Sequence, residues 1–154
     1  MRLSSMADYA VVTMSAAARH CGSGSLADPD GKKRARVSAG QLAAETGLPP
    51  ATVQKLVSKL SAAGLLRSAR GAGGGLKLAR PAAAITLADI VEAVEGPIAL
   101  TACVEAGRHD CGMETACAVR PHWGLVNDAL RGALADVPLT RLAQPKAHER
   151  IVAA

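Results

Sequence analysis

The first stretch of the chain repeats its apolar positions with a helical period. Between residues 5 and 19, apolar side chains recur three and four positions apart, as on one face of a helix. These side chains are Ala10, Val11, Met14 and Ala17. Asp8 interrupts the apolar run that a signal peptide would need. We therefore expect an amphipathic helix here, followed by a loop over the Gly- and Ser-rich residues 21–36.

The next two apolar stripes are short, and their ends are marked. Ser38 and Gln41 stand at capping-box spacing, and Gly47 is placed to end the helix. A second helix begins at a proline, and its apolar positions recur at three and four: Val53, Leu56, Val57 and Leu60. Two short helices joined by a glycine turn are typical of a helix-turn-helix, whose second helix enters the DNA major groove. Its outward-facing residues would be Ala51, Thr52, Gln54 and Lys55.

Two brief apolar runs follow, at residues 65–66 and 76–78, with a glycine-rich stretch between them. This pattern predicts a β-hairpin. A hairpin directly after a recognition helix is a wing, and an arginine at its tip can enter a narrow minor groove. Arg70 is the candidate. The glycines lack the Lys-Ser/Thr ending of a P-loop and open a strand, which argues against a nucleotide site.

Two further helices complete the pattern. Thr86 and Asp89 form another capping pair, with Gly96 as the stop. From His122 onward a second stripe predicts an amphipathic helix, whose apolar face can pack on its own domain or on a second subunit. That stripe comprises Trp123, Val126, Leu130 and Leu134. A short final turn or helix follows. The element order predicts a mainly α chain with a small β wing: a winged helix-turn-helix plus a long C-terminal helix.

Composition agrees with this interpretation. The chain has 154 residues, enough for one domain, and a net charge of +5 that favours a polyanionic partner such as nucleic acid. Tyr9 and Trp123 are its aromatic residues, so the core has to be built from aliphatic side chains. No apolar run approaches the roughly 18 residues of a membrane span. We expect a cytoplasmic protein with no membrane partner.

Three of the four cysteines, Cys103, Cys111 and Cys117, are spaced C-x7-C-x5-C. These intervals are too long for the C-x2-C knuckles of structural zinc sites. Clustered thiolates suit an iron–sulfur cluster, which usually needs four ligands. Donors for the fourth position are His122, His109, Glu114, Asp110 and Asp8. A zinc site, free thiols and a disulfide remain as alternatives, while Cys21 is read as an incidental thiol.

Enzyme signatures are missing from the sequence. We find no nucleophile elbow, no metalloprotease helix and no dinucleotide fingerprint. A redox enzyme would normally carry a compact C-x-x-C motif, which is absent. We therefore expect no enzymatic activity and no small-molecule substrate, although a small iron–sulfur or thiol oxidoreductase is kept as an alternative.

Taken together, these motifs resemble a known family. The segments are MRLSSMADYAVV, the helix-turn-helix, RGAGGGLKLARP, ITLADIVEAVEGPIALTAC and the cysteine loop. They are similar to the bacterial winged-helix regulators that sense iron–sulfur clusters, the group of the IscR and NsrR repressors, and most of all to regulators of SUF-type cluster assembly. The resemblance covers residues 1–143.

That resemblance implies a homodimer whose cluster, [2Fe-2S] rather than [4Fe-4S], is held by Cys103, Cys111 and Cys117. Some members take their fourth ligand from a histidine three positions after the last cysteine, and others from an acidic residue in the first helix of the partner. His122 follows by five positions, so Asp8 is favoured. A zinc- or thiol-sensing regulator of the same fold is the alternative.

The resemblance also implies a palindromic DNA operator and repression of cluster-assembly genes. The matching recognition residues are Ala51, Gln54 and Lys55, with Arg70 on the wing. Gln54 is suited to adenine, and Lys55 to guanine or phosphate. We expect a DNA-binding region at 1–82, a cluster loop and dimerisation helix at 83–145, and a flexible tail at 146–154.

Overall fold

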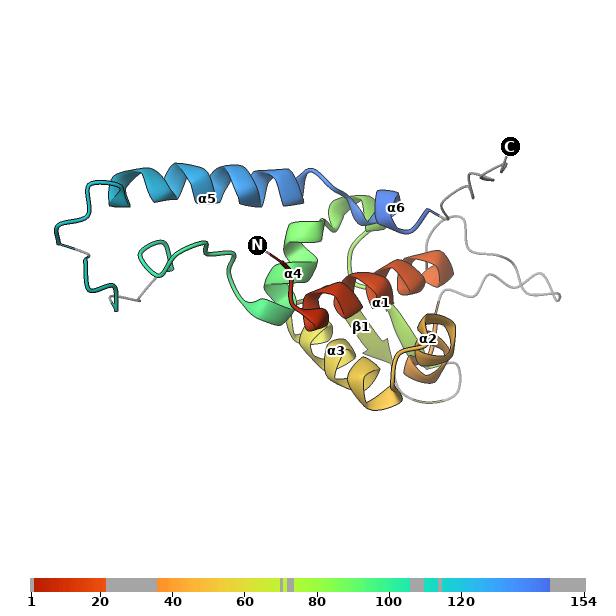
Figure 1. Ribbon diagram of the computed structural model, residues 1–154. Helices are drawn as coiled ribbons and strands as arrows, with labels where there is room; N and C mark the ends of the chain where they lie inside the picture. Colours follow the sequence, from red (N-terminus) through yellow and green to blue (C-terminus); the bar gives the residue numbers. More distant parts are fainter. Residues whose placement is uncertain are drawn as a thin grey trace, which may run out of the picture.

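The structure is a computed structural model that describes residues 2–21, 36–69, 71, 74–105, 110–113 and 115–144. Figure 1 shows its elements in chain order. They are α1 (Ser5–Cys21), α2 (Ala39–Thr46), α3 (Pro50–Ala62), β1 (Leu66–Ala69), β2 (Gly75–Leu78), η1 (Ala82–Ala84), α4 (Leu87–Glu95), α5 (Arg120–Ala135) and α6 (Leu139–Leu142). The predicted class, mainly helical with a small β wing, is confirmed.

Helices α1 to α4 and the β1–β2 hairpin surround one aliphatic core, and we call this part the body. Helix α1 packs against α2, α3, α4, α6 and β2. Its alanines bring the other helices close, and its own Met14 is completely buried together with Leu56 of α3 and Ile90 of α4. Ile85 and Ile90 share the core with residues before position 82, the expected boundary of the DNA-binding region.

The helix ends follow the local sequence. At α2, Ser38 accepts a hydrogen bond from the Gln41 backbone and the Gln41 side chain accepts one from the Ser38 backbone. Gly47 ends the helix with a φ of 71°, a conformation that glycine adopts without steric cost. Thr86 and Asp89 form the same capping box at α4. These predicted helix ends are confirmed.

The predicted hairpin is also confirmed. β1 and β2 pair antiparallel, with Leu66 opposite Leu78 and Arg67 opposite Lys77. Val37 extends the sheet by exchanging two backbone hydrogen bonds with Leu76, at 2.9 and 2.7 Å. Gly75 permits this approach, because a Cβ there would lie 3.2 Å from the Val37 carbonyl oxygen.

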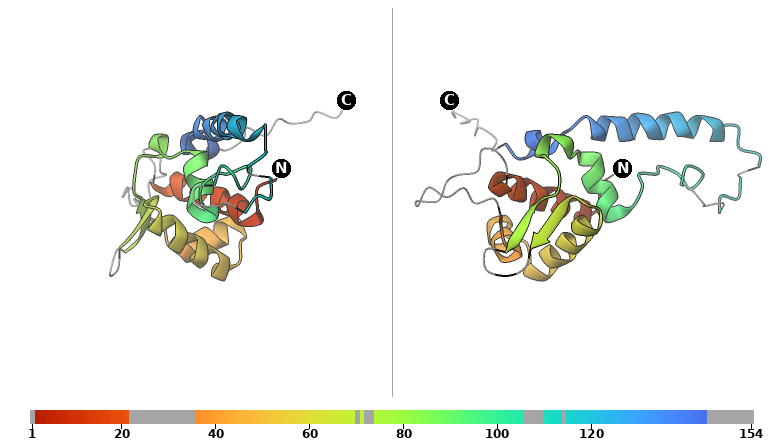
Figure 2. Two further views of the ribbon diagram at one scale, coloured as in Figure 1. Left: turned by 90° about the vertical axis from the view of Figure 1, so that its left-hand side faces the viewer. Right: turned by 180° about the vertical axis from the view of Figure 1, so that it is seen from behind.

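Beyond the body, the described residues from 96 to 135 form a part that we call the arm. It leaves the end of α4, carries three of the four cysteines, and returns as α5, whose first turns lie far from the body (Figures 1 and 2). The segment directly after α5 is held to the body, because the backbone of Leu87 donates to Val137 at 2.9 Å and that of Leu139 donates to Ile85 at 2.7 Å.

Two predicted boundaries move. Helix α1 continues two residues beyond Arg19 to Cys21, and α5 begins at Arg120 instead of His122. Almost all of the expected loop at 21–36, and the expected tail at 146–154, lie outside the described residues. Across the described part of the chain, no helix combines the length and apolarity needed to cross a membrane.

Candidate nucleic-acid interface and cysteine loop

Helix α3 is held by its buried face. Val53, Leu56 and Leu60 are completely buried, and this fixes which residues of the helix face outward. Of the four predicted recognition residues, Ala51, Gln54 and Lys55 are exposed, as expected, whereas Thr52 is half-buried. The first turns of α3 therefore present an amide and an ammonium group to solvent, both suited to base edges or phosphates.

The outer face of the hairpin carries two cations. Arg67 and Lys77 stand opposite each other across the sheet, and both are exposed. Like charges directly opposite on neighbouring strands destabilise the pair. An arrangement of this kind favours an anionic partner, such as DNA phosphate. The sequence alone did not reveal this pairing, because the residue opposite Lys77 depends on how the two strands are aligned. Arg70, the predicted wing-tip residue, lies outside the described residues.

The cysteine loop joins α4 to α5. Cys103 is half-buried, with Thr101 Oγ1 3.1 Å from its Sγ. Cys111 is exposed, Cys117 is half-buried just before α5, and all three are free thiols. Asp8, in the first turn of α1, and His122, in the first turn of α5, are both exposed. His109 and Glu114 lie outside the described residues.

The loop has the donor types of a soft metal site, but the arrangement within one chain does not gather them. Three thiols on one loop suit iron–sulfur ligation chemically. Among the described residues, no three His, Cys, Asp or Glu side chains lie together in a way that could hold a metal ion. The residues therefore fit the group by their chemistry, and bringing them together requires the loop to rearrange.

Cys21, the fourth cysteine, lies apart at the end of α1. Its Sγ lies 3.6 Å from the Leu76 carbonyl oxygen in β2. Burial raises the pKa of this thiol, which keeps it in the less reactive protonated form. This setting agrees with its interpretation as an incidental thiol.

An unexpected polar residue joins α5 to the first residues of the arm. Asn127 is 7% exposed and is the one buried residue of α5, a helix that the structure describes in full. Its Nδ2 donates to the Ile98 carbonyl at 2.9 Å, and its Oδ1 accepts from the Leu100 backbone at 3.0 Å. Sequence reasoning missed it, because the helical stripe was traced through the apolar residues beside it. The available signal was that Asn127 lies one turn after Trp123 and two turns before Leu134, and so shares their side of the helix.

An ion pair lies one turn further along α5. Arg131 donates two hydrogen bonds to Glu92 of α4, from Nε at 2.8 Å and from Nη2 at 3.0 Å. Glu92 also accepts from the Ile98 backbone at 3.4 Å. The hydrogen bond from Arg131 lowers the pKa of Glu92 despite its partial burial.

Helix α4 is also tied to the recognition helix. Lys59, in the last turns of α3, donates from Nζ to the Val94 carbonyl oxygen at 2.6 Å. Carbonyls in the last turn of a helix have no partner within the helix, and a cation there also complements the helix dipole. This hydrogen bond links the end of α4 to the end of α3.

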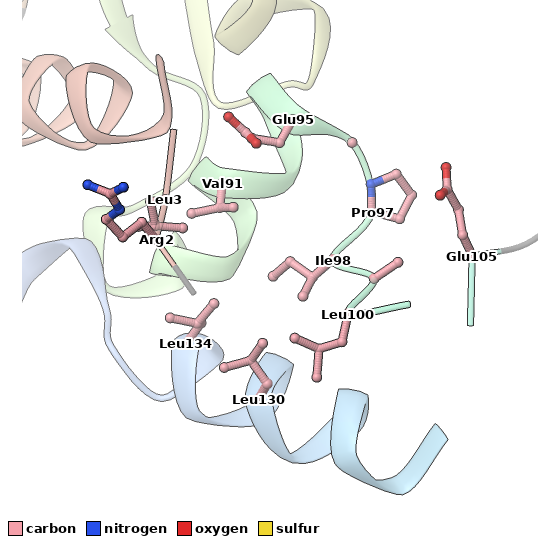
Figure 3. Close-up of a pocket in the computed structure, with 12 residues that line it drawn as sticks. Arg2, Leu3, Val91, Glu95, Pro97, Ile98, Leu100, Glu105, Leu130 and Leu134 are labelled. Carbon is pink, nitrogen blue, oxygen red and sulfur yellow. The ribbon is translucent and has the colours of Figure 1, made fainter. Parts of the chain in front are cut away.

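A pocket of about 390 Å³ lies where the arm meets the body. Figure 3 shows Leu130 and Leu134 of α5 facing Ile98 and Leu100 across it, with Arg2 and Glu95 at its edge. The side chains of segment 98–100 thus border open space, while the backbone of the same segment is held by Asn127.

The comparisons with known proteins agree with this architecture. A model of the Rrf2 family, described as iron-dependent transcriptional regulators, matches residues 3–145. The chain belongs to the Rrf2 family. As an Rrf2 protein it is a DNA-binding transcription regulator, and the resemblance that the sequence indicated is confirmed at this level.

Individual relatives span most of this Rrf2 chain. It is 34% identical over 134 residues to protein aau3 of Rhizobium meliloti, an alignment covering 87% of this chain and 75% of that protein. It is 30% identical over 142 residues to the HTH-type transcriptional regulator IscR of Vibrio atlanticus, covering 92% and 75%. The structure of CymR, the global cysteine regulator of B. subtilis, superposes with a TM-score of 0.65 at 29% identity, covering 93% of this chain and 96% of that one.

Proposed function

We propose that this Rrf2 protein is a homodimer that binds a palindromic operator, with an affinity set by an iron–sulfur cluster on the cysteine loop. The observation that carries this proposal is the position of Cys103, Cys111 and Cys117, all free thiols, on the one segment that joins the DNA-binding body to α5. Any ligand that gathers these thiols has to move that segment. We infer a cytoplasmic repressor of cluster-assembly genes, acting without enzymatic activity.

When bound, the cluster would supply an iron-dependent and redox-sensitive group, and we favour [2Fe-2S]. Cys103, Cys111 and Cys117 would hold it, with Asp8 of the partner subunit or His122 as the fourth ligand. A fourth ligand other than thiolate makes such a group more labile, which suits a sensor. Both candidates are exposed, so either is accessible to a rearranged loop.

The homodimer is supported by the outer face of α5. Val126, Ala129 and Ala133 lie on one side of the helix, and all three are exposed. Leu125, beside them, is 73% exposed. An apolar helix face of this extent indicates a partner, and the small alanines allow a second helix to approach closely. A second copy of α5 would place two recognition helices on one duplex, as a palindrome requires.

Iron and sulfide analysis after anaerobic purification tests the cluster. We expect a coloured protein that contains both, and we expect the separate changes Cys103→Ser, Cys111→Ser and Cys117→Ser each to reduce bound iron severely. Cys21→Ser is the matched control and should retain it. Asp8→Ala and His122→Ala then identify the fourth ligand. A colourless wild-type protein with stoichiometric zinc would contradict the proposal.

Operator binding at several salt concentrations tests the DNA interface. Gln54→Ala should lower affinity for the operator by about 1–3 kcal/mol and relax base preference at one position. Four further variants each remove one cation: Lys55→Ala, Arg67→Ala, Arg70→Ala and Lys77→Ala. Each should weaken binding to all DNA sequences and should lower by about one the number of salt ions released on binding, as measured from the salt dependence of the affinity. An unchanged salt dependence in Arg67→Ala and Lys77→Ala would remove the wing from the interface.

A thiol-based regulator is the second candidate. It is favoured by the free thiols, which do not form a metal-binding group among the described residues, and by the likeness to CymR. In this case peroxide would oxidise two thiols to a disulfide and be reduced to two waters. Iron-free protein whose operator affinity changes with peroxide, and recovers with a dithiol, would support this candidate over the cluster.

A further inference from the structure

The buried contact between α5 and segment 98–100, at the start of the arm, is polar where an apolar one is the norm. Asn127 is the buried residue of the fully described α5, and an amide transferred from water without compensation costs free energy. Here both ends of the amide are satisfied by the backbone of segment 98–100. Such a contact has a defined direction and register, because an amide with two partners fits in only one arrangement.

Three backbone groups of that segment are held by side chains from two helices. Asn127 of α5 binds the Ile98 carbonyl and the Leu100 N–H, and Glu92 of α4 binds the Ile98 N–H. Arg131 then joins Glu92 to α5 through its paired hydrogen bonds. We call Glu92, Asn127 and Arg131 the clamp. Cys103 follows the clamped segment by three residues.

The clamp also reaches the recognition helix. Glu92 and Val94 lie on the same short helix α4, and the Val94 carbonyl is held by Lys59 of α3 at 2.6 Å. A shift of α4 relative to α3 would strain this hydrogen bond, and because the two helices also pack against each other, such a shift is expected to carry α3 along. The pocket of about 390 Å³ beside Ile98 and Leu100 leaves room for segment 98–100 to move without the resistance of a close-packed core.

We propose that Asn127, supported by Glu92 and Arg131, is a positioning residue that couples the cysteine loop to the recognition helix. When the loop rearranges, segment 98–100 shifts, the clamp moves α4, and Lys59 transmits that movement to α3. This inference rests on the proposed function, in which the state of Cys103, Cys111 and Cys117 controls DNA affinity. It assigns the transmission to four named side chains, none of which is a proposed DNA contact or a loop thiol.

The first test uses protein prepared without iron, and it measures hydrogen exchange at individual backbone amides. Asn127→Leu keeps the branching at Cγ but loses both hydrogen bonds, so the Leu100 amide should exchange faster. Asn127→Asp retains an acceptor and should preserve Leu100 protection better than Asn127→Leu. Asp128→Asn, the exposed neighbour, is the matched control and should leave exchange unchanged. Equal Leu100 exchange in wild type and Asn127→Leu would overturn the proposal.

The second test compares operator affinity with the cysteines loaded and unloaded. Coupling between sites typically changes affinity about 5- to 150-fold. We expect the ratio of the two operator affinities, loaded and unloaded, to lie in this range for the wild type. In Asn127→Leu we expect the same ratio to approach one. Lys59→Met should reduce the ratio as well while leaving Leu100 protection intact. A side chain with a purely structural role would lower stability but leave the ratio unchanged, and that result would overturn the proposal.

The two proposals fail differently. If wild-type protein shows the same operator affinity in both states, the proposed function is wrong. If the wild type shows a ratio and Asn127→Leu retains it at full size, the proposed function stands and the clamp is wrong. Should Asn127→Leu not fold, Glu92→Gln and Arg131→Met probe the same connection at more exposed positions and are expected to reduce the ratio. A full ratio in both of these variants would also reject the clamp.

Discussion

The body and the arm bury their side chains in different ways. In the body, aliphatic residues from α1 to α4 are completely buried, among them Leu56 and Leu60. In the arm, α5 buries Asn127, while Leu125 is 73% and Val126 48% exposed. A core driven by apolar burial supports a stable fold by itself. A long helix that buries a polar residue and leaves an apolar face exposed is expected to gain further stability from the partner proposed above.

The largest expected difference concerns one leucine in each part. Leu56→Ala leaves a cavity in the body and should lower the free energy of unfolding by about 2–5 kcal/mol. Leu125→Ala, on the exposed face of α5, should change the free energy of unfolding of the monomer by less than about 0.5 kcal/mol. Urea unfolding at several protein concentrations measures both and separates dimer effects from monomer effects. Equal losses at low concentration would show that α5 is part of the core.

A charge on the open face of α5 should break the dimer and leave the body folded. Leu125→Glu introduces a carboxylate into the proposed contact and is expected to raise the dimer dissociation constant at least about tenfold, or about 1.4 kcal/mol. Analytical ultracentrifugation measures this constant, and circular dichroism checks the fold. Asp128→Lys changes charge elsewhere on the helix and serves as the control. A dimer unaffected by Leu125→Glu would place the interface on another surface.

Helix caps provide a smaller contrast. Ser38→Ala or Thr86→Ala removes a capping box from the body and should lower the free energy of unfolding by about 1 kcal/mol. In the arm, Val119 is the N-cap of α5 and makes no side-chain cap hydrogen bond, so Val119→Ala should have almost no effect on the monomer. Thermal or urea unfolding measures all three. A large loss in Val119→Ala would mean that the start of α5 is packed within the chain.

The body could be predicted from sequence to a greater extent than the arm. Ser38, Gly47 and Thr86 act within their own helices, so their roles can be seen in a few neighbouring letters. The stripe on α3 likewise predicted its buried face. The cross-strand pair of Arg67 and Lys77 depends on hairpin register, which the sequence leaves open by one or two residues.

In the arm, the important contacts join distant positions. Asn127 binds backbone groups 27 and 29 residues away. Because nearly every residue has the same backbone groups, the sequence does not mark which of them bind a side chain. Periodicity placed Trp123 and Leu130 on one stripe but did not reveal that the buried residue between them is polar. The cysteines were found by their spacing alone. Their mutual arrangement depends on the loop between them, and the sequence does not determine it.

Acid titration should give the smallest effect, and it distinguishes two glutamates. At Glu45, burial raises the pKa, but hydrogen bonds from His20 and Arg19 outweigh it and the net pKa is lowered. At Glu92, the hydrogen bond from Arg131 lowers the pKa. A lowered carboxyl pKa means that the unfolded chain binds more protons, so stability is present above about pH 4.5 and is lost as the pH falls through the folded-state value.

Glu45 joins α1 to α2 inside the body, whereas Glu92 joins α4 to the arm. The pH dependence due to Glu45 should therefore appear in global unfolding, and Glu45→Gln should flatten it. That due to Glu92 should appear in the protection factor of the Leu100 amide, because an arm attached by polar contacts opens before the body unfolds. Both effects are small, since these ion pairs are partly exposed and salt screens them.

Arg131→Met should flatten the pH dependence of Leu100 protection as Glu92→Gln does, and the double variant should have no further effect. A Glu92→Gln effect confined to global unfolding would mean that arm and body unfold as one unit, and the contrast between them would then lie in surface exposure alone.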